Sequence, residues 1–179
     1  MCATPCAPVR TRLSAQLRSG TIVAMETDDA RVMAERLHMG DREDDGMPVI
    51  RHVRRVASRT PAEARSVAWL HEVLEFTAIT EEKLLQEGLT GDELRALRLL
   101  HRTADTRSDR VYLAHLELIA RAAGRSGNLA RMVKIADLED RCLHPRVRPD
   151  GWSPPYELGL QLLRPTTDER HWADAADTA

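Results

Sequence analysis

Residues 60–76 read TPAEARSVAWLHEVLEF and carry the clearest helix signal in the chain. The stretch opens on Thr60-Pro61-Ala62-Glu63, a capping box in which the Thr60 and Glu63 side chains can bind free backbone N–H groups. Proline in the first helical position fits this reading. Apolar side chains follow at helical spacing, namely Val67, Ala68, Leu70, Leu74 and Phe76. The stretch therefore predicts one amphipathic helix.

Similar signals recur on both sides of this stretch. Thr27 or Asp28 can cap a helix that Gly40 ends, and Thr90 with Glu93 forms a second capping box. The expected helices cover 27–40, 60–76, 80–88 capped by Thr80, 90–100, 109–123, a long helix starting at Ser126 or Asn128, and a short one at 156–163. No alternating pattern of useful length indicates a strand, so the sequence predicts an all-α fold.

Length and composition agree with one helical core. The chain has 179 residues, of which 42% are hydrophobic and only 3% aromatic, which favours a Leu, Ala and Val core over an aromatic-rich β-sandwich. We divide the chain into a mobile extension (1–24), a helical domain (25–145) and a Pro-rich C-terminal extension with a short helix (146–179).

Charge and targeting signals narrow the function. The 26 basic and 28 acidic residues leave a net charge of -2, which disfavours nucleic acid as a partner. We find neither a membrane-spanning stretch nor a secretory signal, so we expect a cytoplasmic protein with no membrane partner. The strong preference for Arg over Lys is associated with GC-rich bacterial genomes. Three cysteines are too few for a disulfide framework.

Four residues could build a metal site: His52, the adjacent His71 and Glu72, and Asp137. Imidazole and carboxylate ligands suit a divalent transition metal that activates water. Glu75 shares a helix face with His71 and Glu72, where it could orient or deprotonate that water. By spacing alone a solvated surface pair is the commoner explanation. The zinc-protease motif does not fit, because position 75 is Glu where that motif needs a second His.

Three ordered segments strengthen the metal-site interpretation. The first is His38-x-Gly40 followed by DGMPVIRH at 45–52, the second is AWLHEVLEFT at 68–77, and the third is VKIAD at 133–137. In this order and at these intervals they resemble the motifs of the HD-domain metal-dependent phosphohydrolases. The similarity is greatest to the compact branch related to the hydrolase domain of RelA/SpoT-type alarmone enzymes, and it covers about residues 28–142.

The resemblance implies an HD-domain helical bundle that hydrolyses a small phosphorylated, nucleotide-like metabolite. It implies one divalent ion, with manganese as first choice and zinc, iron or cobalt as alternatives, held by His52, His71, Glu72 and Asp137. Glu75 would be the catalytic group that positions water. The expected substrate contacts are Arg102, Lys134 and Tyr112, although Lys134 could instead pair with an acid such as Glu75 and Tyr112 could simply pack. An oligomer is compatible with the sequence.

The departures from the family pattern favour an alternative. Position 72 is Glu instead of Asp, Phe76 replaces a second catalytic acid, and Arg141 and His101 replace a usual Asn and Thr. The chain could therefore be a catalytically impaired HD domain that serves as a nucleotide-binding or protein-interaction module.

Charged residues near His52 in the sequence affect which phosphorylated substrate the site could bind. Glu43 and Asp44 stand where the alarmone enzymes place Arg and Lys, so we predict little hydrolysis of (p)ppGpp. Four nearby arginines, Arg51, Arg54, Arg55 and Arg59, could steer a phosphate, although a solvated helix face is the commoner explanation.

Overall fold

The computed structural model describes residues 24–102, 108–145 and 151–164. Within these ranges the regular elements are helices, joined by loops, and no strand forms beyond an isolated bridge between Arg42 and Pro48. The all-α prediction is therefore confirmed. The elements are α1 (Thr27–Leu37), α2 (Val49–Arg59), the 3-10 helix η3 (Ala62–Ala64), α3 (Arg65–Leu70), α4 (Val73–Phe76), α5 (Glu81–Gln86), α6 (Gly91–Leu100), α7 (Asp109–Arg121), α8 (Gly124–Leu143) and α9 (Tyr156–Leu163). The expected mobile extension lies outside the described residues except for Ala24.

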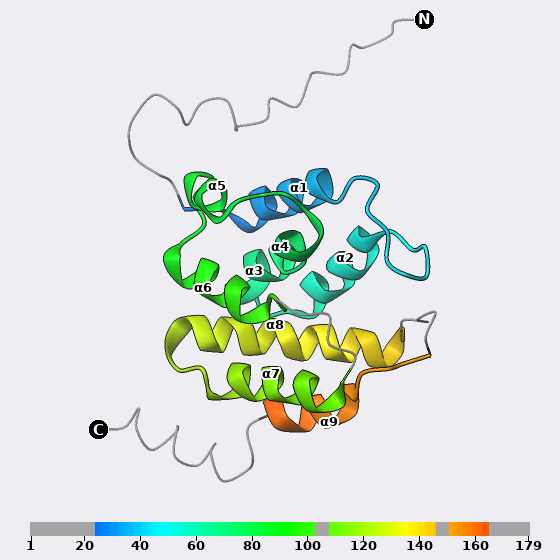
Figure 1. Ribbon diagram of the computed structural model, residues 1–179. Coiled ribbons are helices and arrows are strands. Elements are labelled where there is room, and N and C mark those ends of the chain that lie inside the picture. Colours follow the sequence, from blue (N-terminus) through cyan, green and yellow to red (C-terminus); the bar gives the residue numbers. More distant parts are fainter. Residues whose placement is uncertain (1–23, 103–107, 146–150, 165–179) are drawn as a thin grey trace, which may run out of the picture.

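The long helix α8 runs between two groups of helices (Figure 1). It packs against α2, α3 and α6 on one side and against α7 and α9 on the other. Polar side chains of α8 are consequently buried along with apolar ones, among them Lys134, Asp137, Asp140 and Arg141. Since buried polar groups need partners, this helix is where the fold concentrates its ion pairs.

The stretch 60–76 departs from the single helix that its pattern predicts. Thr60 is the residue at which α2 ends, and its hydroxyl donates to the Val56 carbonyl at 2.9 Å. The predicted capping box, in which this hydroxyl would accept the Glu63 N–H, does not form. The chain then forms η3, α3 and α4, with a turn at His71 and Glu72. Tertiary packing overrides the local signal here, because α3 is buried over its last five residues, 66–70, and lies in the centre of the molecule.

Other helix boundaries follow their capping residues closely. Thr80 accepts the Lys83 N–H at 3.2 Å, and the capping box of Thr90 and Glu93 is present in both directions. Thr27 does not cap α1, and its hydroxyl lies 3.4 Å from that of Ser66. Helix α8 begins two residues before Ser126, and α7 ends at Arg121, two residues earlier than expected.

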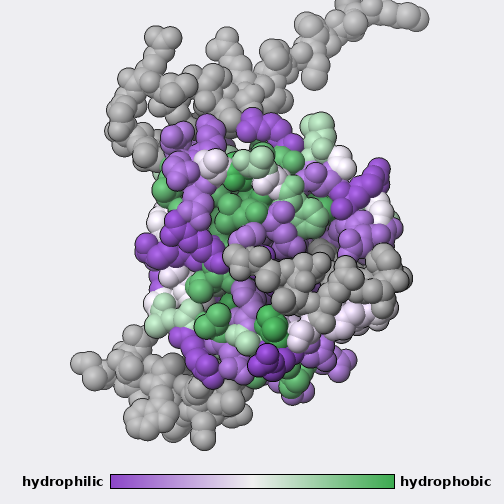
Figure 2. Space-filling view, in the orientation of Figure 1, coloured by the Kyte–Doolittle hydropathy of each residue, from purple (hydrophilic) through white to green (hydrophobic). Residues whose placement is uncertain are grey.

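The short C-terminal helix forms as expected and packs on α7 and α8. Gly159 permits a close approach, since a Cβ there would lie 2.5 Å from Leu116 Cδ1 and 3.1 Å from Leu138 Cδ1. Figure 2 shows one face of the molecule, where hydrophobic side chains gather in the upper group of helices and hydrophilic ones border them. In the described part of the chain, no helix combines the length and the apolar character needed to cross a bilayer.

Replacing Gly127 with Ala is expected to destabilise the fold by about 1–3 kcal/mol. A Cβ at Gly127 would lie 2.0 Å from the Ala122 carbonyl oxygen, which is backbone and cannot move without shifting the α7–α8 connection. Gly91→Ala is the matched control, because its Cβ would meet only the flexible end of Arg95, at 3.4 Å. Urea unfolding of both variants checks this prediction, and equal midpoints for the two would contradict it.

Candidate metal centre and pocket

Four side chains from three parts of the fold meet at one point. His52 comes from α2, His71 and Glu72 from the turn between α3 and α4, and Asp137 from α8. His52 Nε2 lies 3.3 Å from His71 Nε2 and 3.1 Å from Asp137 Oδ1. Glu72 Oε1 lies 3.5 Å from His52 Nε2 and 3.6 Å from His71 Nε2. All four residues are buried.

These distances fit atoms that share one divalent ion. Ligand atoms held at about 2.0–2.2 Å from an ion lie roughly 2.8–3.6 Å from their neighbours in tetrahedral or octahedral geometry. The donor atoms of His52, His71 and Glu72 all lie within 4.8 Å of one another, so this group could hold a metal ion. Asp137 adds a second carboxylate beside His52.

The hydrogen bonds on the outer ring nitrogens orient both histidines toward the centre. His71 Nδ1 donates to the Ala68 carbonyl at 2.7 Å, and His52 Nδ1 donates to the Asp140 carboxylate at 2.8 Å. In the neutral form each Nε2 therefore carries a lone pair, and the two lone pairs face each other. Such an arrangement calls for a cation or a proton between them, and metal-binding histidines are commonly oriented in this way.

The two histidines differ in their affinity for that proton. Burial opposes charge on His52, but hydrogen bonds to Asp137, Asp140 and Glu72 outweigh it and raise the pKa to about 9. Burial lowers the pKa of His71 below its usual value. A proton on His52 thus balances the carboxylates when no ion is bound, and a metal ion would compete with it for the same lone pair.

Asp140 accepts a hydrogen bond from the outer ring nitrogen of His52, and the sequence alone did not single out this residue. Its carboxylate is fully buried and accepts two hydrogen bonds from Arg55 and one from Arg59, each 2.8 Å long. Burial opposes ionisation, but the hydrogen bonds from His52 and Arg55 lower the pKa of Asp140 far below its usual range. One signal could have found it: Asp140 lies three residues after Asp137, on the same helix face.

Three of the four arginines near His52 pair with an acid, namely Arg54, Arg55 and Arg59. Arg55 and Arg59 bind the buried carboxylate of Asp140 while about 30% of each side chain stays exposed, so this helix face is solvated and two of its arginines also neutralise a buried acid. Arg54 pairs with Glu35 at 3.0 Å on the surface, and Arg51 is exposed.

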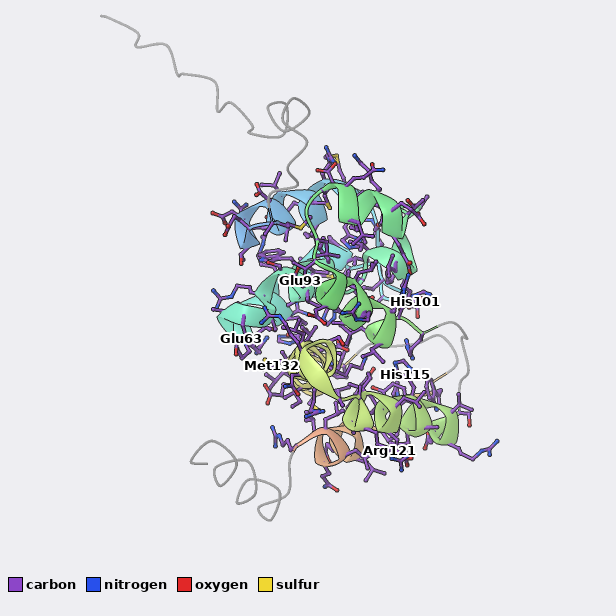
Figure 3. All side chains as sticks on the ribbon, turned by 90° about the vertical axis from the view of Figure 1, so that its left-hand side faces the viewer. Glu63, Glu93, His101, His115, Arg121 and Met132 are labelled. Atoms are coloured by element: carbon purple, nitrogen blue, oxygen red, sulfur yellow. The ribbon has the colours of Figure 1, made fainter. Side chains whose placement is uncertain are left out.

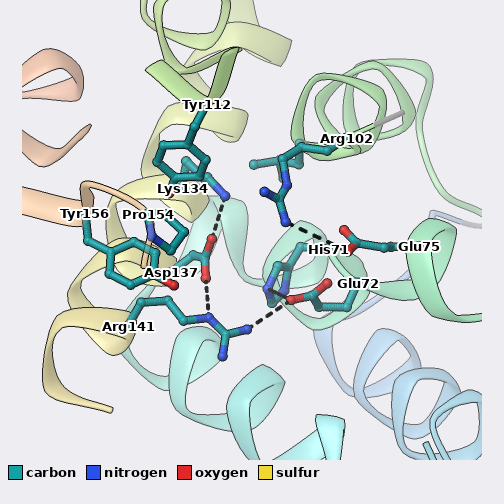
Figure 4. A pocket seen from close by; sticks show the side chains of 11 residues that line it. His71, Glu72, Glu75, Arg102, Tyr112, Lys134, Asp137, Arg141, Pro154 and Tyr156 are labelled. Carbon is teal, nitrogen blue, oxygen red and sulfur yellow. Dashed lines mark hydrogen bonds and ion pairs between the residues drawn. The ribbon is translucent and has the colours of Figure 1, made fainter. Parts of the chain in front are cut away.

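A small pocket opens beside the four-residue cluster (Figure 4). Its cavity measures about 40 Å³, room for about three water molecules. All of the site residues predicted from the sequence line this pocket except His52, which is fully buried. The lining residues are His71, Glu72, Glu75, Leu100, Arg102, Tyr112, Lys134, Asp137, Arg141, Pro154 and Tyr156.

The predicted substrate contacts lie on the pocket wall and are tied to other side chains. Lys134 Nζ donates to Asp137 Oδ2 at 2.7 Å, so Lys134 pairs with an acid of the cluster. The Arg102 guanidinium lies 4.0 Å from Glu75 and 5.8 Å from the centre of the Tyr112 ring. Tyr112 is buried, and burial raises the pKa of its hydroxyl far above the usual range.

Two residues that differ from the HD-domain motifs, Glu43 and Arg141, contact each other. Arg141 lines the pocket and forms an ion pair with Glu43 at 2.9 Å, with both side chains buried. The charge of Glu43 is therefore matched by Arg141 and is not directed at a substrate. Phe76 packs edge-on against His38, with ring centroids 6.3 Å apart.

Comparison of the chain with protein-family models gives no match, and comparison with curated proteins finds no relative. The HD-type assignment accordingly stays a prediction of the three motifs, and the site geometry carries the functional argument.

Proposed function

We propose that this protein is an HD-type, metal-dependent phosphohydrolase that cleaves a phosphate ester or anhydride of a small nucleotide-like metabolite in the cytoplasm. The observation that carries the proposal is the convergence of two imidazole lone pairs and two carboxylates at 3.1–3.6 Å. His52, His71, Glu72 and Asp137 would hold one divalent ion. Mixed nitrogen and oxygen donors suit manganese, with zinc, iron and cobalt as alternatives.

The remaining pocket residues supply the other needs of phosphoryl hydrolysis. A bound ion polarises a phosphoryl oxygen and lowers the pKa of a water molecule. Glu75 lines the same pocket and would position such a water molecule and accept its proton. Lys134 and Arg102 bring positive charge to the wall where phosphoryl oxygens would lie. The small cavity favours a phosphoryl group at the ion, with the rest of the substrate outside.

A panel assay tests the proposal. Purified protein with Mn²⁺ is incubated with nucleoside monophosphates, sugar phosphates and a chromogenic phosphate ester, and phosphate release is measured. We expect turnover of at least one substrate that is lost in Asp137→Ala. Saturable binding of a phosphorylated ligand with no turnover would instead support the alternative, a nucleotide-binding or interaction module. The observation that favours this alternative is Phe76, which stands where the HD-domain motif has a second catalytic acid and packs on His38.

Hydrolysis of (p)ppGpp is expected to be very slow at micromolar substrate, even with saturating manganese. The related enzymes anchor the nucleotide with an Arg and a Lys where this chain has Glu43 and Asp44. Each lost contact to a charged group costs about 1.5–3 kcal/mol, so losing two weakens binding roughly a hundredfold or more. The negative charge of Glu43 is matched by Arg141, so Glu43 contributes a lost contact but no direct repulsion. Rapid pyrophosphate release that Asp137→Ala abolishes would contradict this prediction.

A further inference from the structure

We propose that Arg141 binds the phosphoryl group of the substrate and that Glu43 is the positioning residue that holds Arg141 at the pocket. This inference rests on the proposed function and adds a residue and a ligand chemistry to it, a phosphoryl anion bound by a guanidinium next to the metal centre.

Arg141 lies on the pocket wall and contacts both carboxylates of the candidate metal centre, Glu72 and Asp137. It is 5% exposed, yet it lines the cavity. Its guanidinium lies 3.4 Å from Glu72 Oε1 and 3.6 Å from Asp137 Oδ1, whereas its contact with Glu43 is 2.9 Å (Figure 4 shows the Glu72 and Asp137 contacts). The firm contact is with Glu43, and the contacts with the two candidate ligands are longer.

The loop that carries Glu43 is tightly bonded. Glu43 N–H donates to the Met47 carbonyl at 2.8 Å, Gly46 N–H donates to the Glu43 carbonyl at 2.8 Å, and Met47 N–H donates to Asp45 Oδ1 at 2.9 Å. Arg42 closes the loop through the Gly46 carbonyl at 2.8 Å. Among residues 41–48, all of them described, Glu43 alone is buried. The loop thus presents one carboxylate, in a fixed place, to Arg141.

A metal ion in the site would weaken the electrostatic attraction between Arg141 and the two nearby carboxylates. Glu72 and Asp137 would then direct their negative charge to the ion, and their attraction for Arg141 would weaken. The Glu43 pair would remain, because Glu43 is outside the donor cluster. The guanidinium would stay at the cavity with N–H groups available to phosphoryl oxygens, which its planar fork matches in geometry.

The same placement makes Arg141 unfavourable for the metal ion. A fixed positive charge within 3.4–3.6 Å of two carboxylates lowers their affinity for another cation. Removal of Arg141 should therefore weaken phosphate binding and strengthen metal binding. A residue with only a structural role would weaken both, so the opposite signs distinguish the two cases.

The test is isothermal titration of the full chain with Mn²⁺ and, separately, with inorganic phosphate in the absence and presence of Mn²⁺. For Arg141→Gln we expect phosphate affinity to fall about 10- to 100-fold, the loss of a charged hydrogen-bond donor, while Mn²⁺ affinity rises. Arg141→Lys keeps the charge without the fork and should recover part of the phosphate affinity. Arg51→Gln, an exposed arginine on α2, is the control and should change neither affinity.

Variants of Glu43 test its positioning role. Glu43→Gln frees Arg141 to move toward Glu72 and Asp137, so we expect weaker Mn²⁺ binding. The double variant Glu43→Gln/Arg141→Gln places two neutral amides together and should regain Mn²⁺ affinity but not phosphate affinity. It also keeps the test valid if burial of an unmatched Glu43 unfolds the Arg141→Gln protein.

The outcomes separate this inference from the proposed function. Phosphate binding that depends on Arg141 in a protein without turnover would support the subsite and contradict hydrolysis. Turnover with a KM and phosphate affinity that Arg141→Gln leaves within twofold would support hydrolysis and overturn the inference. No binding of phosphate to the wild-type protein at millimolar concentration would also overturn it.

Discussion

Replacing His71 with Asn should abolish Mn²⁺ binding in the micromolar range and all metal-dependent turnover. His71 Nε2 lies 3.3 Å from His52 Nε2 and 3.6 Å from Glu72 Oε1, at the centre of the candidate site. Burial lowers the pKa of His71, so the residue is neutral at pH 7 and its removal changes no charge. Loss of a partner outside the first ligand sphere costs about 10–100-fold in metal affinity, and loss of a direct ligand should cost more.

Titration calorimetry and thermal unfolding with and without Mn²⁺ check this result. An ion present at about 100 times its Kd stabilises the wild type by roughly 2.7 kcal/mol, and His71→Asn should show no such stabilisation. His115→Asn is the matched control. His115 lies on α7 (Figure 3), outside the four-residue cluster, and burial lowers its pKa to about 4, so it too is neutral. Unchanged Mn²⁺ affinity in His71→Asn would show that the convergence of side chains is not a metal site.

Replacing Asp140 with Asn should reduce both stability and metal affinity. The variant leaves Arg55 and Arg59 without a charged partner and removes the carboxylate that fixes His52 Nδ1. Breaking a buried ion pair costs about 3–5 kcal/mol. The two arginines are 30% and 31% exposed and can turn toward solvent, which places the expected cost near 3 kcal/mol. Without its orienting partner His52 should bind Mn²⁺ about 10- to 100-fold more weakly.

Glu139→Gln is the control for Asp140→Asn. Glu139 is the neighbouring residue on α8 and also pairs with an arginine, Arg164 at 2.9 Å, but it is 39% exposed. Exposed pairs contribute about 0–1 kcal/mol, so this variant should unfold in urea close to the wild type and keep its Mn²⁺ affinity. If Asp140→Asn matches Glu139→Gln in both measurements, the buried network does not support the metal centre.

Together, these contacts form successive layers around the site. His52, His71, Glu72 and Asp137 converge at the centre, Asp140 with its two arginines orients His52, and the pair of Glu43 and Arg141 borders the pocket. The expected readouts differ between the layers: loss of Mn²⁺ affinity for the first, joint loss of stability and Mn²⁺ affinity for the second, and loss of phosphate affinity with a rise in Mn²⁺ affinity for the third.

Local features of the sequence determined much of the fold. Helix periodicity and the absence of alternating patterns were sufficient to predict an all-α chain, and the caps at Thr80 and Thr90 lie where the sequence predicts them. These signals act over three or four residues, so they can be read without knowing the rest of the structure. The candidate ligands were also identifiable, because imidazole and carboxylate side chains in recurrent motifs narrow the chemistry.

Tertiary structure alone decided how the site is held. The break at His71 and Glu72 overrides a helical pattern, because the central burial of α3 outweighs local propensity. Arg55 and Asp140 are 85 residues apart, and Glu43 and Arg141 are 98 apart. In a chain with 30% charged residues, any acid can in principle pair with any base. Only the packing of α2 and the 41–48 loop against α8 selects these partners, since it buries them together where an unmatched charge would be costly.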